Sequence, residues 1–540
     1  WESDRLDWLG EVGWTHHTGS DVESQRASLG GLVLREDFLA ALRRLNPGVP
    51  DQFLQQAASD LLQPKSQDPI SENKAFHDLL AHGYRGVTYT DPAGLEQTPT
   101  LRLLGDEVLQ NQWRAVQQVR IQEKGFSRRF DVVLYVNGLP LAVVELKQAG
   151  HKGATIAKAH SQLGTYLHEF GMAFRTVVAT VISDGLSAQY GTPFTPLNHY
   201  SPWTVDEQGV PVETGPDATE LDILAHGLFE PARFLDVVVH FTAFDETDTG
   251  LIKRIAKPHQ YFAVRKAVDS TVRAVDSHGK AGVVWHTQGS GKSMEMELYA
   301  NLVMTHPRLL NPTLVVITDR TELDGQLYET FARSTLLAES PLQVRRRSEL
   351  RDQLSNRASG GILFTTLQKF GRTSDERDAG DEHPLLSDRR NIIVIVDEAH
   401  RSHYDDLDGY ARHLKDALPN ATLIAFTGTP ISAADHNTRA VFGDYIDIYD
   451  LTRAVEDGAT VPVVFEQRLI QISLADGFTP ADLDRIADEQ SRDLDLAERQ
   501  RIEQSVAVIN AIYGAPERLA ALAGDIVEHW EDRRERMNES

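Results

Sequence analysis

The stretch Gly282-Val-Val-Trp-His-Thr-Gln-Gly-Ser-Gly-Lys-Ser293 decides the fold of the region around it. Its apolar run, Val283 to Trp285, predicts a β-strand, and the residues after Ser293 predict a helix. A short loop rich in glycine and serine connects the two. A strand, a glycine-rich loop and a helix in this order are typical of a site that binds phosphate groups.

Each residue type in this loop has a physical reason to bind phosphate. Glycine lets backbone N–H groups approach phosphate oxygens without an intervening Cβ, and the N-terminus of the next helix adds positive partial charge. Lys292 can reach the β and γ phosphates, and the hydroxyl of Ser293 suits a Mg²⁺ ligand. The predicted phosphate-binding residues are Gly289, Ser290, Gly291, Lys292 and Ser293.

One residue of the stretch departs from the strict phosphate-loop pattern. That pattern has glycine five positions before Gly291, and His286 stands there instead. An alternative interpretation is a glycine and serine turn that precedes a surface helix. The context of strand, loop and helix favours phosphate binding over that alternative.

The composition is that of a globular protein with room for several domains. The chain has 540 residues, a formal net charge of −25 and no cysteine. Disulfides and cysteine-ligated zinc or iron–sulfur sites are therefore excluded, which fits a cytoplasmic protein. No apolar run reaches the roughly 18 residues of a membrane helix, so we expect no membrane contact. Because the chain is acidic, any contact with nucleic acid must be local.

The region around the phosphate loop alternates between predicted strands and helices. Several strands are continuous apolar runs, as buried parallel strands are. The predicted strands are 282–286, 313–318, 361–365, 391–396 and 422–426. This order predicts a doubly wound, parallel α/β sheet with its ligands at the carboxyl ends of the strands.

Two acidic residues follow one of these strands. The run from Asn391 to Val396 is apolar after its first residue, and it ends at Asp397 and Glu398. Asp397 could hold Mg²⁺ through water, and Glu398 could activate a water for attack on a γ-phosphate. The alternative is a helix N-cap, where an acidic residue is favoured by the helix dipole. The phosphate loop about a hundred residues upstream favours the functional interpretation.

A second informative stretch runs from Phe130 to Lys147. Two β-rich runs flank Asn137-Gly138, which is a strong hairpin signal. A two-residue loop pairs positions whose numbers sum to 275, and this register places Asp131 close to Val144 and within reach of Glu145.

Glu145 and Lys147 are two residues apart, so they project from the same face of their strand. Two carboxylates and an ammonium would converge there with Asp131, an arrangement suited to metal-dependent cleavage of phosphodiesters. The alternative is a hairpin edge with charged ends. Further along, Gln162 and Tyr166 are four residues apart and share one face of a predicted helix.

These residues carry a first resemblance. Asp131, Glu145-x-Lys147 and Gln162-x-x-x-Tyr166 resemble the nuclease domain of the PD-(D/E)xK superfamily, in the form found in the restriction (R) subunit of type I restriction enzymes. Phe130 replaces the proline of the superfamily's name. The resemblance implies that Asp131 and Glu145 bind Mg²⁺, that Lys147 is catalytic, and that Gln162 and Tyr166 support the site or contact DNA.

The downstream motifs resemble the core of superfamily two helicases and translocases. They are Gly289 to Ser293, Asp397-Glu-Ala-His400 and Thr427-Gly-Thr-Pro430. The resemblance implies ATP as a cofactor, contact of Gln260 with adenine, and a link between ATP hydrolysis and DNA movement at Thr427, Gly428 and Thr429. The segments that resemble the DNA-contacting segments of R subunits include Asp319, Arg320, Thr365 and Thr366.

The predicted architecture is an N-terminal restriction-endonuclease-like α/β nuclease domain followed by a RecA-like motor lobe with a doubly wound parallel sheet. We expect the nuclease domain over 1–249, lobe one over 250–470, and a helical linker or the start of a second lobe over 471–540. The last region shows no further strands and no Gln-x-x-Gly-Arg-x-x-Arg segment. We therefore expect the chain to be a fragment of a longer subunit.

The resemblance implies a subunit that cleaves unmethylated foreign double-stranded DNA while it translocates it, using ATP and Mg²⁺. Its implied partners are DNA and the separate modification and specificity subunits. Two other readings stay open: a repair or remodelling helicase with a nuclease-like domain, and a motor whose hairpin domain is inactive and serves for docking.

Overall fold

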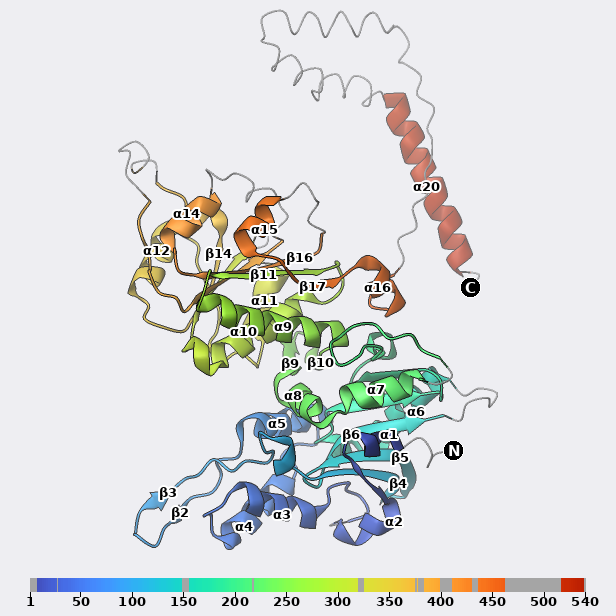
Figure 1. Cartoon of the computed structure of the whole chain (residues 1–540). Helices are drawn as coiled ribbons and strands as arrows, with labels where there is room; N and C mark the ends of the chain where they lie inside the picture. Colours follow the sequence, from blue (N-terminus) through green and yellow to red (C-terminus); the bar gives the residue numbers. More distant parts are fainter. Residues whose placement is uncertain are drawn as a thin grey trace, which may run out of the picture. The chain divides into compact units, whose positions relative to one another are not determined.

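The computed structural model describes residues 7–26, 28–147, 155–215, 218–318, 325–373, 376, 383–398, 410–429, 436–461 and 516–538 (Figure 1). The chain divides into two compact units, Trp1–Val461 and Pro462–Ser540. The first unit contains both large sheets, and the second is described only by one helix. Among the described residues, no helix combines the length and apolar character that crossing a membrane requires.

The first 255 residues build a mixed six-stranded sheet with helices on both faces. The strand order is β1-β4-β5-β6-β7-β8, in which β1 pairs with β4 and β6 with β7 in parallel and the other pairs are antiparallel. The strands of this sheet are β1 (Thr15–Thr18), β4 (Trp113–Glu123), β5 (Phe126–Val136), β6 (Leu139–Leu146), β7 (Ala179–Ser183) and β8 (Ala188–Gly191).

The remaining elements of this part are mostly helices. They are α1 (Asp7–Glu11), α2 (Gly19–Val22), α3 (Arg35–Leu45), α4 (Asp51–Leu62), α5 (Pro69–His82), the short hairpin β2 (Tyr89–Thr90) with β3 (Glu96–Gln97), α6 (Ile156–Glu169), α7 (Glu220–Leu228), α8 (Pro231–His240) and the hairpin β9 (Thr242–Thr247) with β10 (Gly250–Ile255). Both faces of β5 are buried: Val132 and Leu134 join the core formed with α3 and α5, while Val133 and Tyr135 join the core formed with α6.

The hairpin of β5 and β6 turns at Asn137-Gly138 as predicted, but its register differs from the expected one. Val136 pairs with Leu139 and Tyr135 with Pro140, which are the predicted pairs, whereas Leu134 pairs with Ala142. Leu141 is therefore an extra residue in β6, a β-bulge. Pro140 has no N–H to donate across the ladder, which explains an irregularity at this place.

The bulge changes the expected neighbour of Asp131. Val144 pairs with Val132 rather than lying beside Asp131, so the sum rule fails beyond the bulge and Asp131 is displaced toward Glu145. The two carboxylates are thus better aligned than the predicted register made them.

Residues 258 to 461 form a seven-stranded sheet in which every pair of neighbours is parallel. The strand order is β13-β14-β12-β15-β16-β11-β17. The elements are α9 (Pro258–Val275), β11 (Lys280–His286), α10 (Lys292–Thr305), β12 (Thr313–Thr318), α11 (Gln326–Arg333), β13 (Leu342–Gln343), α12 (Arg347–Asn356), β14 (Ile362–Thr366), β15 (Ile392–Asp397), α14 (Tyr410–Ala417), β16 (Thr422–Thr427), α15 (His436–Phe442), β17 (Tyr445–Tyr449) and α16 (Leu451–Glu456).

Side chains alternate between two cores across this sheet, as period-two strands require. Val284, Val316 and Ile395 pack with α9, α10 and α11. Their neighbours Val283 and Val315 pack with α12 and α14 on the opposite face. This confirms the predicted doubly wound parallel sheet, and all five predicted strands are present within a few residues. The edge strands β13 and β17 were not predicted.

The hairpin of β9 and β10 connects the two sheets. Lys253 of β10 is buried and donates to Asn73 Oδ1 of α5 at 2.7 Å. The next residue, Arg254, donates to Glu297 Oε2 of α10 at 2.8 Å. Asp245 to Gly250 form the end of β9, the turn of this hairpin and the first residue of β10. The division proposed at residue 249 therefore falls in a turn whose strands are bound to both parts.

Helix α20 (Pro516–Asn538) is the described part of the second unit. It lies within the region 471–540, for which a helical linker or the start of a second lobe was predicted. Residues 471–515 of that region lie outside the described residues.

Gly138 allows a test of the hairpin turn. Its φ is +77°, and an added Cβ would lie 2.5 Å from Leu34 O and 2.7 Å from Phe38 N. We expect Gly138→Ala to lower the free energy of unfolding by about 2–4 kcal/mol, from left-handed strain and backbone overlap together. Gly125→Ala is the matched control, because Gly125 has a φ of +85° with no atom within 4 Å of its Cβ.

Chemical denaturation of the two variants measures this difference. In Gly125→Ala the free energy of unfolding should fall only by the cost of the left-handed backbone strain, roughly 1–2 kcal/mol. Equal losses in both variants would contradict the close packing of this turn against α3.

Candidate functional site

The hairpin places its three predicted catalytic side chains together. Leu146 N donates to Asp131 Oδ2 at 2.8 Å, and Lys147 Nζ lies 2.5 Å from Glu145 Oε1. Glu145 is fully buried, and the side chain of Lys147 is 20% exposed. The acids and the ammonium therefore meet where β6 ends, beside the middle of β5.

The electrostatics of this cluster are unfavourable without a further cation. Burial raises the pKa of Glu145 to about 8, the negative charge of Asp131 acts in the same direction, and Lys147 opposes both. Burial also raises the pKa of Asp131. No donor among the described residues contacts the buried Oε2 of Glu145.

These observations fit a divalent cation. Carboxylate oxygens are the ligands that Mg²⁺ prefers, and Glu145 Oε2 is a buried acceptor without a partner among the described residues. Asp131 and Glu145 are the two residues that would hold the ion.

Helix α6 extends the cluster. Lys147 Nζ donates to Gln162 Oε1 at 2.6 Å, and Gln162 Nε2 donates to the hydroxyl of Tyr166. The ring of Tyr166 packs edge-on against Phe130, with 4.9 Å between the ring centroids. Gln162 therefore orients the lysine, and Phe130, which stands in the place of proline, contributes to the core that positions Tyr166.

The phosphate loop lies between the end of β11 and the start of α10. Gly291 precedes the first residue of α10, Lys292, and has a φ of +93°. A Cβ there would collide with Gln260 Nε2, which donates to Ser290 O at 3.1 Å. His259 Nε2 donates to the same carbonyl at 3.0 Å. The predicted adenine contact, Gln260, thus lies directly against the loop.

The acidic end of β15 faces this loop. Lys292 Nζ is 4.0 Å from Glu398 Oε1, and Gly428 N donates to Glu398 Oε2 at 3.2 Å. A Cβ on Gly428 would lie 2.8 Å from Lys292 Nζ, so a larger residue there would require the lysine side chain to shift. Glu398 adopts a φ of +48°, a strained conformation of the kind found at functional sites. Glu398 N donates to Asp397 Oδ1 at 2.9 Å.

The structure therefore brings Lys292, Glu398 and Gly428 together at the carboxyl ends of β11, β15 and β16. Ser293 lies in the first turn of α10 and is half-buried. Thr429 N donates to Thr427 Oγ1 at 3.3 Å.

The predicted DNA-contacting residues are only partly described. Thr365 and Thr366 end β14 at the same edge of the sheet as Asp397, and both are buried. Asp319 and Arg320 lie outside the described residues, as do Ala399, His400 and Pro430 of the quoted motifs.

Sequence analysis missed a charge network under the phosphate loop. The ring of His286 contacts Glu295 of α10 and Asp447 of β17. Two signals could have revealed it: a histidine in place of glycine at the end of a buried strand, and two glutamates in the otherwise apolar start of α10.

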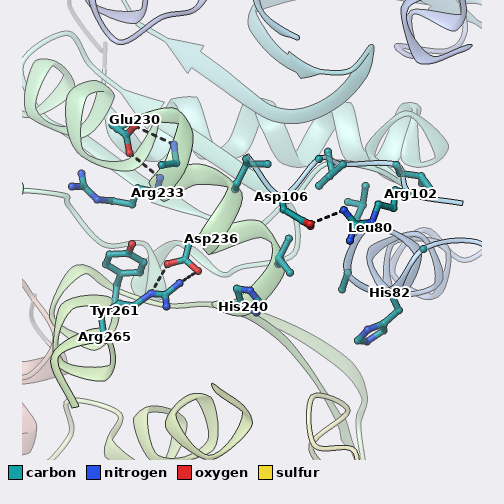
Figure 2. Close-up of a pocket in the computed structure, with 18 of the residues that line it drawn as sticks. Leu80, His82, Arg102, Asp106, Glu230, Arg233, Asp236, His240, Tyr261 and Arg265 are labelled. Carbon is teal, nitrogen blue, oxygen red and sulfur yellow. Dashed lines mark hydrogen bonds and ion pairs between the residues drawn. The ribbon is translucent and has the colours of Figure 1, made fainter. Parts of the chain in front are cut away.

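Two of the cavities formed by the described residues bear on the sites. One, of about 940 Å³, is lined mainly by residues of α5, α8 and α9 and lies apart from the predicted site residues (Figure 2). Two of its carboxylates are in ion pairs, Asp236 with Arg265 and Asp106 with Arg102. A smaller cavity, of about 310 Å³, is lined by Gln260 and by the phosphate loop from Gly289 to Gly291.

The fold and these sites define a class of protein: a nuclease-like domain joined to an ATPase lobe. Comparison with known proteins agrees. A family model described as "Type I restriction enzyme R protein N terminus" matches residues 4–199, and one described as "SWI2/SNF2 ATPase" matches residues 259–500.

Individual relatives agree with the family models. The HindI endonuclease subunit of a type I restriction enzyme from Haemophilus influenzae is 40% identical over 98% of this chain and 51% of its own length. The MjaIXP endonuclease subunit from Methanocaldococcus jannaschii is 32% identical over 98% of this chain and 52% of its own length.

The chain belongs to the R-subunit (HsdR) family of type I restriction enzymes, which confirms the resemblance seen in its motifs. It spans about half the length of the curated relatives it matches. Among solved structures, the helicase domain of Hef from Pyrococcus furiosus matches with a TM-score of 0.24 and 17% identity, over 34% of this chain and 38% of that one. A likeness at that score does not define the fold.

Glu145 gives a prediction about stability and pH. Because its pKa is raised to about 8 in the folded protein, the folded state retains a proton that the unfolded state releases, so stability falls as pH rises from about 4.5 to 8. In the presence of a chelator, Glu145→Gln should therefore become more stable than the unsubstituted chain as pH rises, by at least about 1 kcal/mol at pH 8.

Denaturant titrations at pH 5 and pH 8 measure this effect. Glu96→Gln, at an exposed carboxylate, is the control and should show no such change. Equal stability of the Glu145→Gln variant and the unsubstituted chain at both pH values would contradict the repulsion described for this site.

Proposed function

We propose that this chain supplies the nuclease and the first motor lobe of a type I restriction R subunit. The complete subunit would cleave unmethylated foreign double-stranded DNA with Mg²⁺, coupled to translocation driven by ATP. Modification and specificity subunits would be its partners in a cytoplasmic complex. The observation that carries the proposal is the convergence of Asp131, Glu145 and Lys147 in the same chain as a phosphate loop that faces Glu398.

In the nuclease part, Asp131 and Glu145 would hold the metal, which activates water and neutralises charge on the scissile phosphate. Lys147 has its ammonium beside Glu145 and is held by Gln162. It can donate to a phosphate oxygen as negative charge develops there. Tyr166 supports Gln162 and orients the lysine indirectly.

In the motor part, Lys292 would bind the β and γ phosphates, and Ser293 and Asp397 would hold the nucleotide's Mg²⁺. Glu398 would orient the attacking water, and its carboxylate is fixed by Gly428 N. Gln260 and the 310 Å³ cavity beside it would receive the adenine base.

Coupling and DNA contact are assigned to the residues beyond these catalytic groups. Thr427, Gly428 and Thr429 would link ATP hydrolysis to DNA movement. Gly428 is placed for this role because its N–H donates to Glu398 and its Cα lies close to the ammonium of Lys292. The residues proposed to contact DNA are Asp319, Arg320, Thr365 and Thr366.

The alternative of an inactive docking domain has less support. A hairpin that served only for docking would not need a fully buried carboxylate, Glu145, beside a second, half-buried one, Asp131, because burying a charge is costly. The alternative of a repair or remodelling helicase is less supported, because the family model that matches residues 4–199 and both relatives named above are those of type I restriction enzymes.

The nuclease assignment is tested by substitution in the assembled, full-length enzyme. Glu145→Ala and Lys147→Ala should each reduce Mg²⁺-dependent cleavage of unmethylated plasmid DNA by at least about 100-fold, because a metal ligand or the phosphate-facing cation is lost. DNA-stimulated ATP turnover should stay within about twofold. Glu96→Ala is the control at an exposed carboxylate, and undiminished cleavage by Glu145→Ala would refute the assignment.

The phosphate loop is tested separately. Lys292→Ala should weaken binding of MgATP to the full-length subunit by roughly 100-fold, since a charge-assisted contact of about 3 kcal/mol is removed. Isothermal titration measures the affinity, and Lys415→Ala, at an exposed lysine of α14, is the control. Unchanged affinity in Lys292→Ala would show that nucleotide binds elsewhere.

A further inference from the structure

His286 ends β11 at the position where the strict phosphate-loop pattern has glycine. Its side chain is fully buried. A glycine there would leave space under the loop, whereas the imidazole ring fills it with a polar group. A buried polar ring must have hydrogen-bond partners, or its burial costs several kcal/mol.

Both ring nitrogens have acidic partners. His286 Nδ1 is 2.8 Å from Glu295 Oε1, and His286 Nε2 is 3.0 Å from Asp447 Oδ2. Because carboxylates only accept, the ring must donate from both nitrogens and is therefore a cation. Burial favours the neutral ring, but Glu295 and Asp447 outweigh it and raise the pKa of His286 to about 9. Lys266 Nζ donates to Asp447 Oδ1 at 2.6 Å, so two cations face two anions.

These contacts join four elements around the phosphate loop. His286 ends β11, Glu295 lies near the start of α10, Asp447 lies in β17, and Lys266 lies in α9. The loop leaves β11 directly after His286 and enters α10 at Lys292. The bond from His286 to Glu295 therefore spans the loop from beneath and limits how far its two ends can separate.

A second histidine supports the loop from α9. His259 Nε2 donates to Ser290 O at 3.0 Å, and its ring stacks on Tyr449 of β17 with 3.9 Å between centroids. Burial, followed by the charge of His286, lowers the pKa of His259 to about 3, so this ring is neutral. The neutral ring of His259 and the charged ring of His286 therefore both support the phosphate loop.

A metal ion is the competing explanation for this cluster. His259, His286 and Glu295 offer ligand atoms within 4.8 Å of one another, and no donor among the described residues contacts Glu295 Oε2. However, both nitrogens of His286 already contact carboxylates, and His259 Nε2 is directed at a carbonyl oxygen. A proton on His286 satisfies these contacts as they stand, whereas a metal would have to displace them.

We propose that His286 is a positioning residue of the nucleotide site, which sets the shape of the phosphate loop as a buried cation between Glu295 and Asp447. The proposal rests on the proposed ATPase function. His286 touches no phosphate itself. His286 affects the binding of ATP and of the transition state for hydrolysis equally, because both need the same geometry of the phosphate loop.

The test uses the full-length subunit assembled with its partners. His286→Gln keeps a polar side chain of similar length but removes the charge. We expect the KM for ATP in DNA-stimulated turnover to rise about tenfold with kcat within about threefold, the pattern of lost uniform binding. The matched control is His77→Gln, at a buried histidine of α5 that bonds Val238 O, and it should leave the KM unchanged.

A double substitution tests the contact itself. If His286 acts through Glu295, the effects of His286→Gln and Glu295→Gln on nucleotide affinity should be less than additive by at least about threefold. If His286→Gln does not fold, Asp447→Asn removes one arm of the network and should raise the KM by about three- to tenfold.

Four outcomes would overturn the inference. A lower melting temperature and lower kcat at unchanged KM in His286→Gln would indicate a purely structural residue. Additive effects in the double substitution would show that the contact with Glu295 does not matter. An unchanged KM in Asp447→Asn would show that the contact between His286 and Asp447 does not matter. The purified protein could contain a stoichiometric transition metal that is lost in His286→Gln, with a chelator causing the same rise in KM. That result would show that a metal ion, not a proton on His286, holds the cluster together.

Lys292→Ala separates this inference from the proposed function. If Lys292→Ala abolishes nucleotide binding while His286→Gln does not change it, the positioning role fails and the ATPase assignment stands. If Lys292→Ala leaves the affinity unchanged, the ATPase assignment itself fails.

Discussion

The pair of adjacent carboxylates at the half-buried Asp131 and the fully buried Glu145 is the constraint on which the nuclease part of the structure depends. Two acids held side by side in a protein interior repel each other and lose hydration. Their position follows from β5 and β6, whose apolar residues are covered by helices on both faces. A sheet buried in this way can hold charges that an isolated hairpin could not, and the remaining repulsion is what supports the proposed metal site.

The ATPase lobe also holds charged groups close together in the protein interior, but it does so in a different way. Its functional groups follow strands that are distant in sequence but end at one edge of a parallel sheet. The sheet alone therefore brings Lys292, Glu398 and Gly428 together. Here the charges are balanced within the protein. Lys292 lies near Glu398, and His286 lies between Glu295 and Asp447.

Sequence patterns predicted the features that depend on local rules. Asn137-Gly138 predicts the hairpin because of its turn preference, and the spacing of Glu145 and Lys147 places them on one face. The buried parallel strands are visible as apolar runs. The bulge at Leu141 was not predicted, because one extra residue in a uniformly apolar strand leaves no trace in hydrophobicity.

Other features depend on partners far away in the chain. Strand β17 reads Tyr-Ile-Asp-Ile-Tyr, and its Asp447 argues against a buried strand until its contacts with His286 and Lys266 are known. His286 itself appears in the sequence only as a departure from a pattern. Its role depends on Asp447, 161 residues away, and no local rule connects the two.

We propose that a metal-binding acid cluster and a triphosphate-binding loop belong to one DNA-processing protein. The most direct measurement is a crystal structure of the full-length subunit with Mn²⁺ and a non-hydrolysable ATP analogue, using anomalous scattering to locate the metal. The account predicts one Mn²⁺ bound by Asp131 and Glu145 and a second at the analogue's phosphates, beside Ser293. A map with no metal at the hairpin, or with the analogue bound away from Gly289 to Ser293, would contradict it.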